Sequence, residues 1–116
     1  MNNSKFAQMN QLPHLQVGNL KLFPFAGDKL MTVQADLPKG SIAAKHSHPH
    51  EQMSYVVKGQ VKVRMKGEEF TLSQGGVVHF PSNEEHELEA VEDTLLLDIF
   101  TPVREDFIQK LKEAAK

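Results

Sequence analysis

The chain contains no cysteine among its 116 residues, and this absence excludes a whole group of sites. Without thiols there is no disulfide framework, no zinc–thiolate centre, no iron–sulfur cluster and no cysteine nucleophile. Any metal ion must therefore be held by histidine, carboxylate or amide groups. The six histidines of the sequence supply ligands of that kind.

Long hydrophobic runs and an excess of positive charge are also missing. Apolar runs such as Leu95 to Leu97 are far too short for a membrane-spanning helix. The segment from Met1 to Lys5 lacks the basic-then-apolar order of a secretory signal. The net charge of −2 argues against a nucleic-acid-binding domain, which is usually basic. We therefore expect a cytoplasmic protein with neither a membrane nor a nucleic acid as partner.

The apolar residues that are present recur mostly with a period of two. Val61, Val63 and Met65 alternate with basic residues, which predicts a half-buried strand. Similar short segments follow one another at intervals of about 8–12 residues, separated by Gly, Pro and Asn. This pattern predicts an all-β sandwich or barrel.

Signs of a helix are confined to the end of the chain. Acidic residues at 105–106 precede Phe107, Ile108 and Leu111, and lysines follow them, as is usual along a short helix. At 116 residues we expect one domain. We divide it into an amino-terminal arm at 1–19, a barrel at 20–103 and a carboxy-terminal helix at 104–116.

Three of the histidines lie within five residues, at His46, His48 and His50. In an extended segment, residues two apart point the same way, so His46 and His48 would present two imidazoles at a spacing that one metal ion can bridge. Pro49 favours the extended conformation of His48. Taken alone, the His-x-His segment at 46–48 is as consistent with polar side chains on the surface of a strand as with a metal site.

The wider spacing around these histidines resembles the two motifs of the cupin superfamily. The first motif is a glycine, five residues, His-x-His, three or four residues, a glutamate, six residues and a second glycine. Here the corresponding positions are Gly40, His46, His48, Gln52 and Gly59. In the second motif the matching positions are Gly75, Pro81, Asn83 and His86. The resemblance covers about residues 20–103. It implies an RmlC-like cupin fold, which is a small antiparallel β-barrel or jelly roll.

The same resemblance implies a divalent transition metal inside the barrel, bound by His46, His48, Gln52 and His86. Such ligands suit Ni, Zn, Fe, Mn or Cu and do not choose among them. Glu51 is the alternative fourth ligand, but Gln52 has the motif spacing, and Glu51 falls on the opposite face of a strand. His50 is a candidate neighbour of the site, whereas His14 and His79 have no assigned role.

Three positions depart from the usual motifs. Gln52 replaces a glutamate, so the ligand set carries no negative charge and leaves the 2+ charge of an ion uncompensated. Such an ion is a stronger Lewis acid and attracts an anionic substrate. Asn83 replaces a glycine and also tolerates a positive φ. Ala90 stands where the second motif ends in asparagine.

The predicted last strand contains a carboxylate in apolar surroundings. Asp98 and Phe100 share a face by parity, and burying a carboxylate is costly unless it is paired or functional. If this face lines a cavity, Asp98 is a candidate general base and Phe100 a wall for a ring-shaped ligand. Arg104, one of two arginines, suits bidentate capture of a carboxylate. A structural salt bridge for Asp98 and a turn-capping role for Arg104 are the alternatives.

This segment, from Leu96 to Phe107, is similar to the tail of the pectin-degradation cupins, which ketonise 4,5-unsaturated uronates. The run His-Ser-His-Pro-His-Glu-Gln at 46–52 matches that family too. The resemblance implies an anionic sugar substrate, with Asp98 and Arg104 as catalytic residues and Phe100 and Arg104 as substrate-binding residues. It also implies a homodimer, with the amino-terminal arm docked on the neighbouring subunit.

The sequence favours an enzyme, a metal-dependent isomerase acting on uronates, without deciding whether turnover occurs. A cupin-type metal-dependent oxygenase and a non-catalytic sugar- or effector-binding cupin are the alternative functions. A metal-free structural barrel is a further alternative, which metal analysis would test.

Overall fold

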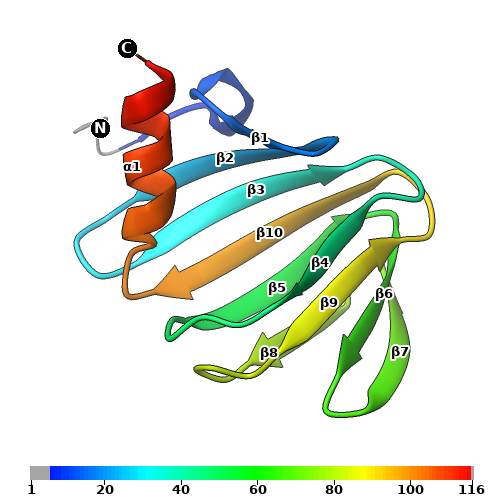
Figure 1. Cartoon of the computed structure of the whole chain (residues 1–116). Coiled ribbons are helices and arrows are strands. Elements are labelled where there is room, and N and C mark those ends of the chain that lie inside the picture. The colour runs from blue at the N-terminus through cyan, green and yellow to red at the C-terminus, as the bar shows by residue number, and fades with distance from the viewer. Residues whose placement is uncertain (1–5, 116) are drawn as a thin grey trace.

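The computed structural model describes residues 6–115, which form two antiparallel sheets and a helix (Figure 1). The strands are β1 Leu15–Val17, β2 Leu20–Ala26, β3 Met31–Leu37, β4 Ile42–His46, β5 Glu51–Lys58, β6 Gln60–Met65, β7 Glu68–Ser73, β8 Val77–Phe80, β9 His86–Ala90 and β10 Thr94–Thr101. The helices are a 3-10 turn η1 Met9–Gln11 and the α-helix α1 Glu105–Ala114. The predicted all-β fold with a short carboxy-terminal helix is confirmed.

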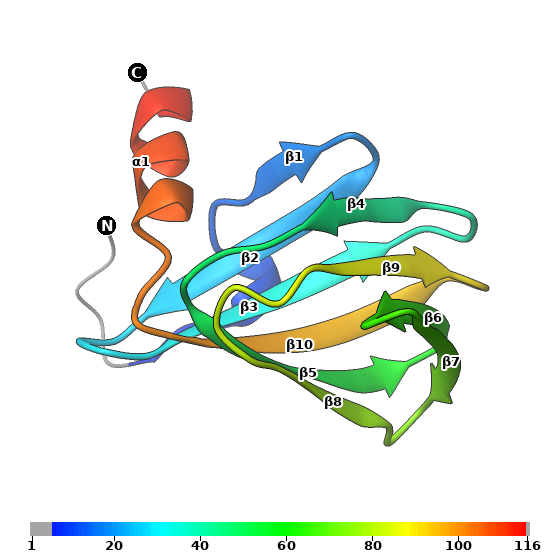
Figure 2. The same ribbon diagram turned by 60° about the horizontal axis from the view of Figure 1, so that its bottom comes forward.

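The two sheets lie face to face and enclose the core (Figure 2). One sheet has six strands in the order β1-β2-β3-β10-β5-β8, and the other has four in the order β4-β9-β6-β7. The central strand β10 pairs with both β3 and β5, so the inward face of β10 lies in the middle of the barrel. Residues that alternate inward along β10 and β5 are therefore placed to line the interior.

The alternation predicted for β6 is confirmed. Val61 and Val63 are fully buried and Met65 is partly buried. They pack with Phe80, Leu88 and other apolar side chains from both sheets. Burying a side chain of this kind stabilises the fold by roughly 1.5–3 kcal/mol. This core lies beside the histidines, because Met65 is in register with His86 at the start of β9.

Two motif positions have backbone conformations that explain their residue types. Gly59 has φ +97 between β5 and β6, and a side chain there would overlap the backbone of Asp93 and Thr94. Asn83 has φ 65 in the turn before β9. Asparagine is among the few non-glycine residues that adopt this conformation readily. The prediction that Asn83 can replace the motif glycine is confirmed in this respect.

The helix α1 packs at one end of the six-stranded sheet. Phe107 and Ile108 of its first turns pack against a small cluster of buried residues that includes Met31, Val33 and Phe100. The helix follows β10 after a cis Thr101–Pro102 peptide bond. In both views it stands beyond the end of β10, away from the four-stranded sheet (Figures 1 and 2). No helix among residues 6–115 is long and apolar enough to cross a membrane.

Residues 15–17 of the predicted arm form strand β1. Strand β1 pairs with β2 of the same chain, with Leu15 opposite Leu22 and Val17 opposite Leu20. Leu15 is buried, and the ring of His14 lies 5.1 Å from that of Phe23. Gly18, at φ 60, permits the tight turn between the strands. These residues thus extend the chain's own sheet. Residues 1–5 of the arm lie outside the described part.

Candidate metal centre

Three imidazoles converge at one end of the barrel. One ligand atom from each of His46, His48 and His86 lies within 4.8 Å of those of the other two. His46 ends β4 and is in register with His86, which begins β9, and their ring centroids are 4.4 Å apart. His48 follows β4 in the loop, with its ring 5.3 Å from that of His86. A group of this size and composition could hold a metal ion.

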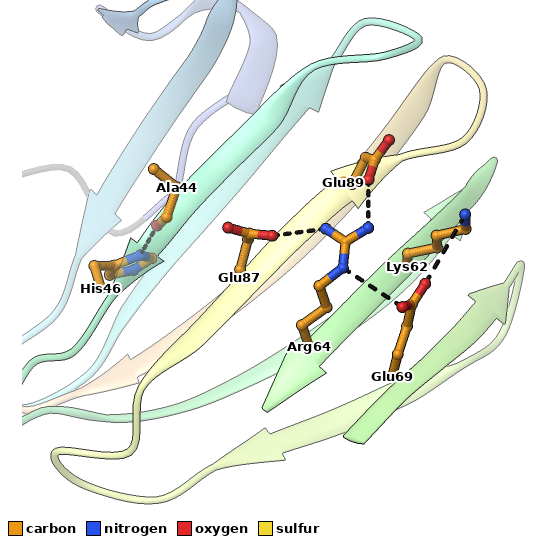
Figure 3. Close-up of polar contacts among 7 residues, drawn as sticks. All are labelled: Ala44, His46, Lys62, Arg64, Glu69, Glu87 and Glu89. Carbon is orange, nitrogen blue, oxygen red and sulfur yellow. Dashed lines mark hydrogen bonds and ion pairs between the residues drawn. The ribbon is translucent and has the colours of Figure 1, made fainter. Parts of the chain in front are cut away.

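Each of the three rings is fixed by a backbone carbonyl close to it in the sequence. The Nδ1 atom of His46 lies 2.7 Å from the Ala44 carbonyl oxygen (Figure 3), and that of His86 lies 3.0 Å from the Glu84 carbonyl oxygen. The Nδ1 of His48 lies 3.0 Å from the carbonyl oxygen of His50. A carbonyl only accepts, so each Nδ1 carries hydrogen and donates it. In the neutral ring, Nε2 then keeps a lone pair that can bind a metal.

The Nε2 atom of His86 is the clearest sign that this cluster suits an ion. It is buried and has no hydrogen-bond partner among residues 6–115. An unpaired buried polar atom costs about 1–3 kcal/mol. Burial is the main cause that lowers the pKa of His86 to about 4, so the ring is neutral at pH 7 and cannot use Nε2 as a donor. A cation bound by Nε2 would satisfy it.

Gln52 supplies a fourth candidate ligand atom. Its Oε1 lies 3.0 Å from Nε2 of His48. Burial is the largest cause that lowers the pKa of His48, followed by the nearby charge of Arg104, so this ring too is neutral at pH 7. With hydrogen on Nδ1, two lone pairs then face each other, which is unfavourable unless both bind a cation. The donor set of three imidazoles and one amide therefore fits a divalent transition metal.

Glu51 faces away from this cluster. It is exposed, and its Oε2 lies 2.7 Å from Nε2 of His79 on the outer face of the six-stranded sheet. Gln52 is 3% exposed and points inward, as the alternation along β5 requires. The structure thus places the amide beside the histidines and leaves the neighbouring carboxylate, together with His79, on the surface. His14 packs on Phe23, also away from the cluster.

Asp98 lies in the barrel interior and is connected to Gln52 by hydrogen bonds through the Ser54 hydroxyl. It is opposite Ser54 in the pairing of β10 with β5, and the Ser54 hydroxyl lies 2.6 Å from its Oδ1. Burial is the main cause that raises the pKa of Asp98 to about 6, against the lowering effects of Ser54, Arg104 and Gln52. The carboxyl group therefore changes protonation nearer to neutral pH than an exposed aspartate does, which suits proton transfer.

Phe100 and Arg104 lie between the histidines and α1. The Phe100 ring is 5.6 Å from that of His48, and the Arg104 guanidinium carbon is 5.0 Å from the Phe100 centroid. The same carbon lies 4.0 Å from the centroid of Phe107. Arg104 donates from Nε and Nη2 to the carboxylate of Asp106, at 3.0 and 2.8 Å. Its Nη1 makes no hydrogen bond to any described residue.

The position of Arg104 opposes a general preference of helices. It is the residue immediately before α1, at the helix end where the macrodipole disfavours a cation. Asp106 and two aromatic rings offset this cost, and Arg104 as a whole is 8% exposed. Arg104 occupies the N-cap position of α1, but its side chain makes no capping hydrogen bond. Nη1 remains able to bind an anion.

Sequence reasoning missed two residues that touch the predicted ligands. Phe80 is fully buried and stacks on His86, with centroids 4.0 Å apart and planes 15° from parallel. Ser54 lies between Gln52 and Asp98. Ser54 could have been found, because it is two residues after Gln52 on the same strand face. The contact of Phe80 crosses between the two sheets, which no local pattern reveals.

His50 lies beside the cluster and is not one of the three converging rings. Its ring centroid is 5.6 Å from that of His48, and its Nδ1 is buried without a hydrogen-bond partner in the described chain. Its carbonyl oxygen accepts from His48. The backbone of His50 therefore supports the site, while its side chain lies at the rim.

Comparisons with known proteins identify the family and the fold of the chain. A family model described as "Cupin domain" matches residues 33–100. A protein of Dickeya dadantii (strain 3937) named "Pectin degradation protein KdgF" is 36% identical over 83 residues, which are 70% of this chain and 76% of that protein. The segment matched by the family model contains all four predicted metal-binding positions, whereas Arg104 lies beyond its end.

Solved structures show the same fold. An RmlC-like cupin from Shewanella frigidimarina NCIMB 400 superposes with a TM-score of 0.84 at 31% identity, over 90% of this chain and 96% of that one. The structure of KdgF from Halomonas sp. superposes with a TM-score of 0.82 at 30% identity, over 88% of this chain and 98% of that one.

Proposed function

The chain belongs to the cupin domain family and resembles the pectin-degradation cupins within it, and from this premise we propose that it is a metal-dependent enzyme that ketonises 4,5-unsaturated uronates. One observation carries the proposal. The three histidines, the buried carboxyl group of Asp98 and the guanidinium of Arg104 lie around the aromatic ring of Phe100, on which a sugar ring could pack.

The proposed substrate has features that match this arrangement. It is an anion with a carboxylate, a ring hemiacetal and an enol-ether double bond. Opening the ring turns the hemiacetal into an aldehyde and the enol-ether carbon into a ketone. One proton leaves the hemiacetal hydroxyl and one is added to the alkene carbon, so the atoms balance without an oxidant. The required chemistry is proton transfer together with polarisation of an oxygen.

The residues of the site divide these tasks. Arg104 binds the substrate carboxylate through Nη1, since Asp106 occupies its other edge. Phe100 packs on the sugar ring. Asp98 moves the proton, because burial places its pKa at about 6. His46, His48, Gln52 and His86 hold the metal, which would supply Lewis acidity to polarise a substrate oxygen.

The neutral donor set supports an anionic substrate. None of the four ligand side chains carries a negative charge at pH 7, and Arg104 adds a positive charge close to His48 and His86. The interior charge that opposes an anion is that of Asp98, which hydrogen bonds to Ser54. The centre with its ion would therefore attract a carboxylate.

The test is an absorbance assay on unsaturated uronates derived from galacturonate, mannuronate and guluronate. Metal-loaded protein should bleach the absorbance of the double bond faster than buffer, equally with and without oxygen. Oxygen uptake coupled to substrate loss would instead identify an oxygenase. Binding without bleaching would identify a sugar- or effector-binding cupin, and protein without metal by elemental analysis would contradict metal dependence.

We further propose a homodimer in the cytoplasm. The support is an apolar outer face on the six-stranded sheet, where Met53 and Tyr55 of β5 and Val77 of β8 are 48%, 42% and 58% exposed. A two-fold axis through the middle of β5 would bring this apolar face against its own copy. Since β1 stays in its own sheet, this face replaces the arm as the proposed contact.

A further inference from the structure

We propose that Ser54 is a positioning residue that fixes the Gln52 amide with its oxygen towards the three imidazoles, and so joins the metal centre to Asp98. The inference deepens the proposed function, on which it rests for the identity of the site. It concerns a hydrogen-bonded row across β5 and β10 in which each group limits the orientation of the next.

The row begins at the carboxylate. An ionised carboxylate only accepts hydrogen bonds, so the 2.6 Å contact with Oδ1 of Asp98 uses the single hydrogen of the Ser54 hydroxyl. The hydroxyl oxygen is then left as an acceptor. Ser54 is 1% exposed, so water does not compete for this role.

The polarity of the hydroxyl determines that of the amide. The Gln52 side-chain nitrogen lies 2.9 Å from the Ser54 oxygen and donates to it. A flipped amide would place two oxygens at that distance with no hydrogen between them. The amide oxygen must therefore face the other way, where it lies 3.0 Å from Nε2 of His48.

The same row explains why an amide, in place of a carboxylate, stands at position 52. A carboxylate there would need the Ser54 hydrogen that Asp98 already uses. Two buried carboxylates would then compete for one hydrogen, and like charges in such a site disfavour joint ionisation. Gln52 both donates to Ser54 and offers an oxygen to a metal, which a glutamate cannot do when ionised.

The experiment measures Co²⁺ affinity and the visible spectrum of the bound ion, in the full chain. Ser54→Ala should weaken Co²⁺ binding by about 10–100-fold, as loss of a group that orients a ligand commonly does, and should alter the ligand-field bands. Ser54→Thr keeps the hydroxyl and should restore most of the affinity. The matched control is Ser41→Ala, which removes another buried hydroxyl, one that donates to the Pro38 carbonyl oxygen at 2.6 Å. It should leave Co²⁺ binding unchanged.

A double-mutant cycle separates positioning from general loss of structure. If Ser54 acts through Gln52, Ser54→Ala should cause no further loss of Co²⁺ affinity in a Gln52→Ala background. An equal loss in both backgrounds would overturn the proposal, as would a Ser54→Ala protein with wild-type affinity and spectrum. The cycle does not depend on whether the threonine variant folds.

The uronate assay, run in parallel, distinguishes the two proposals. Bleaching by the wild type combined with unchanged Co²⁺ binding in Ser54→Ala would leave the function standing and reject the role of Ser54. The expected Co²⁺ results without bleaching would support the role of Ser54 and reject the function. A wild-type protein that binds no Co²⁺ would reject the positioning role.

Discussion

Asp106 holds Arg104 by one edge only. Two nitrogens of the guanidinium donate to its carboxylate at 3.0 and 2.8 Å, and the remaining nitrogen, Nη1, is left for a ligand. The side chain is thus oriented by a neighbour two residues away before any substrate binds. Orientation of this kind reduces the entropy that a binding event must overcome.

Arg104→Lys should lower kcat/KM for the unsaturated uronate by roughly tenfold to a hundredfold. A hydrogen bond to a charged group contributes about 1.5–3 kcal/mol, and lysine cannot reproduce the planar fork. Asp106→Asn should act in the same direction, mainly through KM, because the guanidinium loses its fixed edge. Steady-state kinetics measure both. An unchanged KM in each variant would contradict the role of Arg104 in binding the anion.

Asp98→Asn should lower kcat by about 10²–10⁴-fold, the usual contribution of a general acid or base. Asparagine keeps an oxygen that can accept the hydrogen of Ser54, so the hydrogen-bonded row is preserved and the proton-transfer group is lost. Co²⁺ affinity should stay close to that of the wild type. Full activity in this variant would remove Asp98 from the mechanism.

Removing metal should lower the thermal stability of the protein. His86 leaves a buried nitrogen unpaired when no ion is bound, and a metal at about 100 times its Kd stabilises the folded state by about 2.7 kcal/mol. Differential scanning calorimetry should show a lower Tm after chelation and recovery when Co²⁺ is added. His86→Ala should abolish the response, whereas His14→Ala, away from the cluster, should retain it.

Arg64 should contribute to stability in a pH-dependent manner. It donates to Glu87 and Glu89 at 2.6 Å each on the outer face of the four-stranded sheet (Figure 3). The hydrogen bond from Arg64 is the largest cause that lowers the pKa of Glu89 below 4.5. The stabilisation is therefore fully present above about pH 4.5 and is lost as the pH falls through the lowered pKa.

Urea unfolding of Arg64→Met at pH 7 and in acid checks this expectation. The loss of free energy of unfolding should be seen at pH 7, should shrink with added salt, and should disappear in acid. Lys62→Met is the matched control. The Lys62 ammonium lies 3.9 Å from the nearest Glu69 oxygen, so its removal should change the free energy of unfolding less than that of Arg64. A loss that is the same at both pH values would indicate packing by the arginine stem in place of charge.

Charges placed on the outer face of the six-stranded sheet should dissociate the proposed dimer. Tyr55→Glu combined with Val77→Glu would place like charges opposite each other in an apolar contact. Sedimentation equilibrium should then report a monomer where the wild type is a dimer. Removal of residues 1–14 tests the arm in the same experiment and should leave the dimer intact. If the truncation alone produced a monomer, the amino-terminal arm would be identified as the dimer contact.

Much of the fold could be predicted because it depends on local alternation. The pattern of Val61, Val63 and Met65 requires only that one face of a strand be apolar. The conformation of Asn83 follows from a preference of the residue itself. By contrast, the pairing of Leu15 with Leu22 was missed, because a three-residue strand in polar surroundings has too few residues to show a period.

The candidate site divides in the same way. His46 and His48 could be placed together by parity, but bringing His86 beside them requires the register of β4 with β9, which only the family motif implied. The surroundings of Arg104 depend on where α1 packs, so its contact with the Phe107 ring was beyond sequence reasoning. The opposite positions of Ser54 and Asp98 are likewise a property of strand register.

The unequal exposure of the three imidazoles bears on how quickly metal is exchanged. His46 is exposed, whereas His48 and His86 are 8% and 1% exposed. An ion would therefore enter and leave past His46. Changes around the end of β4 should alter the residence time of the ion more than its equilibrium affinity. When several metals compete in a cell, an open path of this kind allows repeated replacement, so that supply and thermodynamic preference, more than the order of arrival, select the occupant.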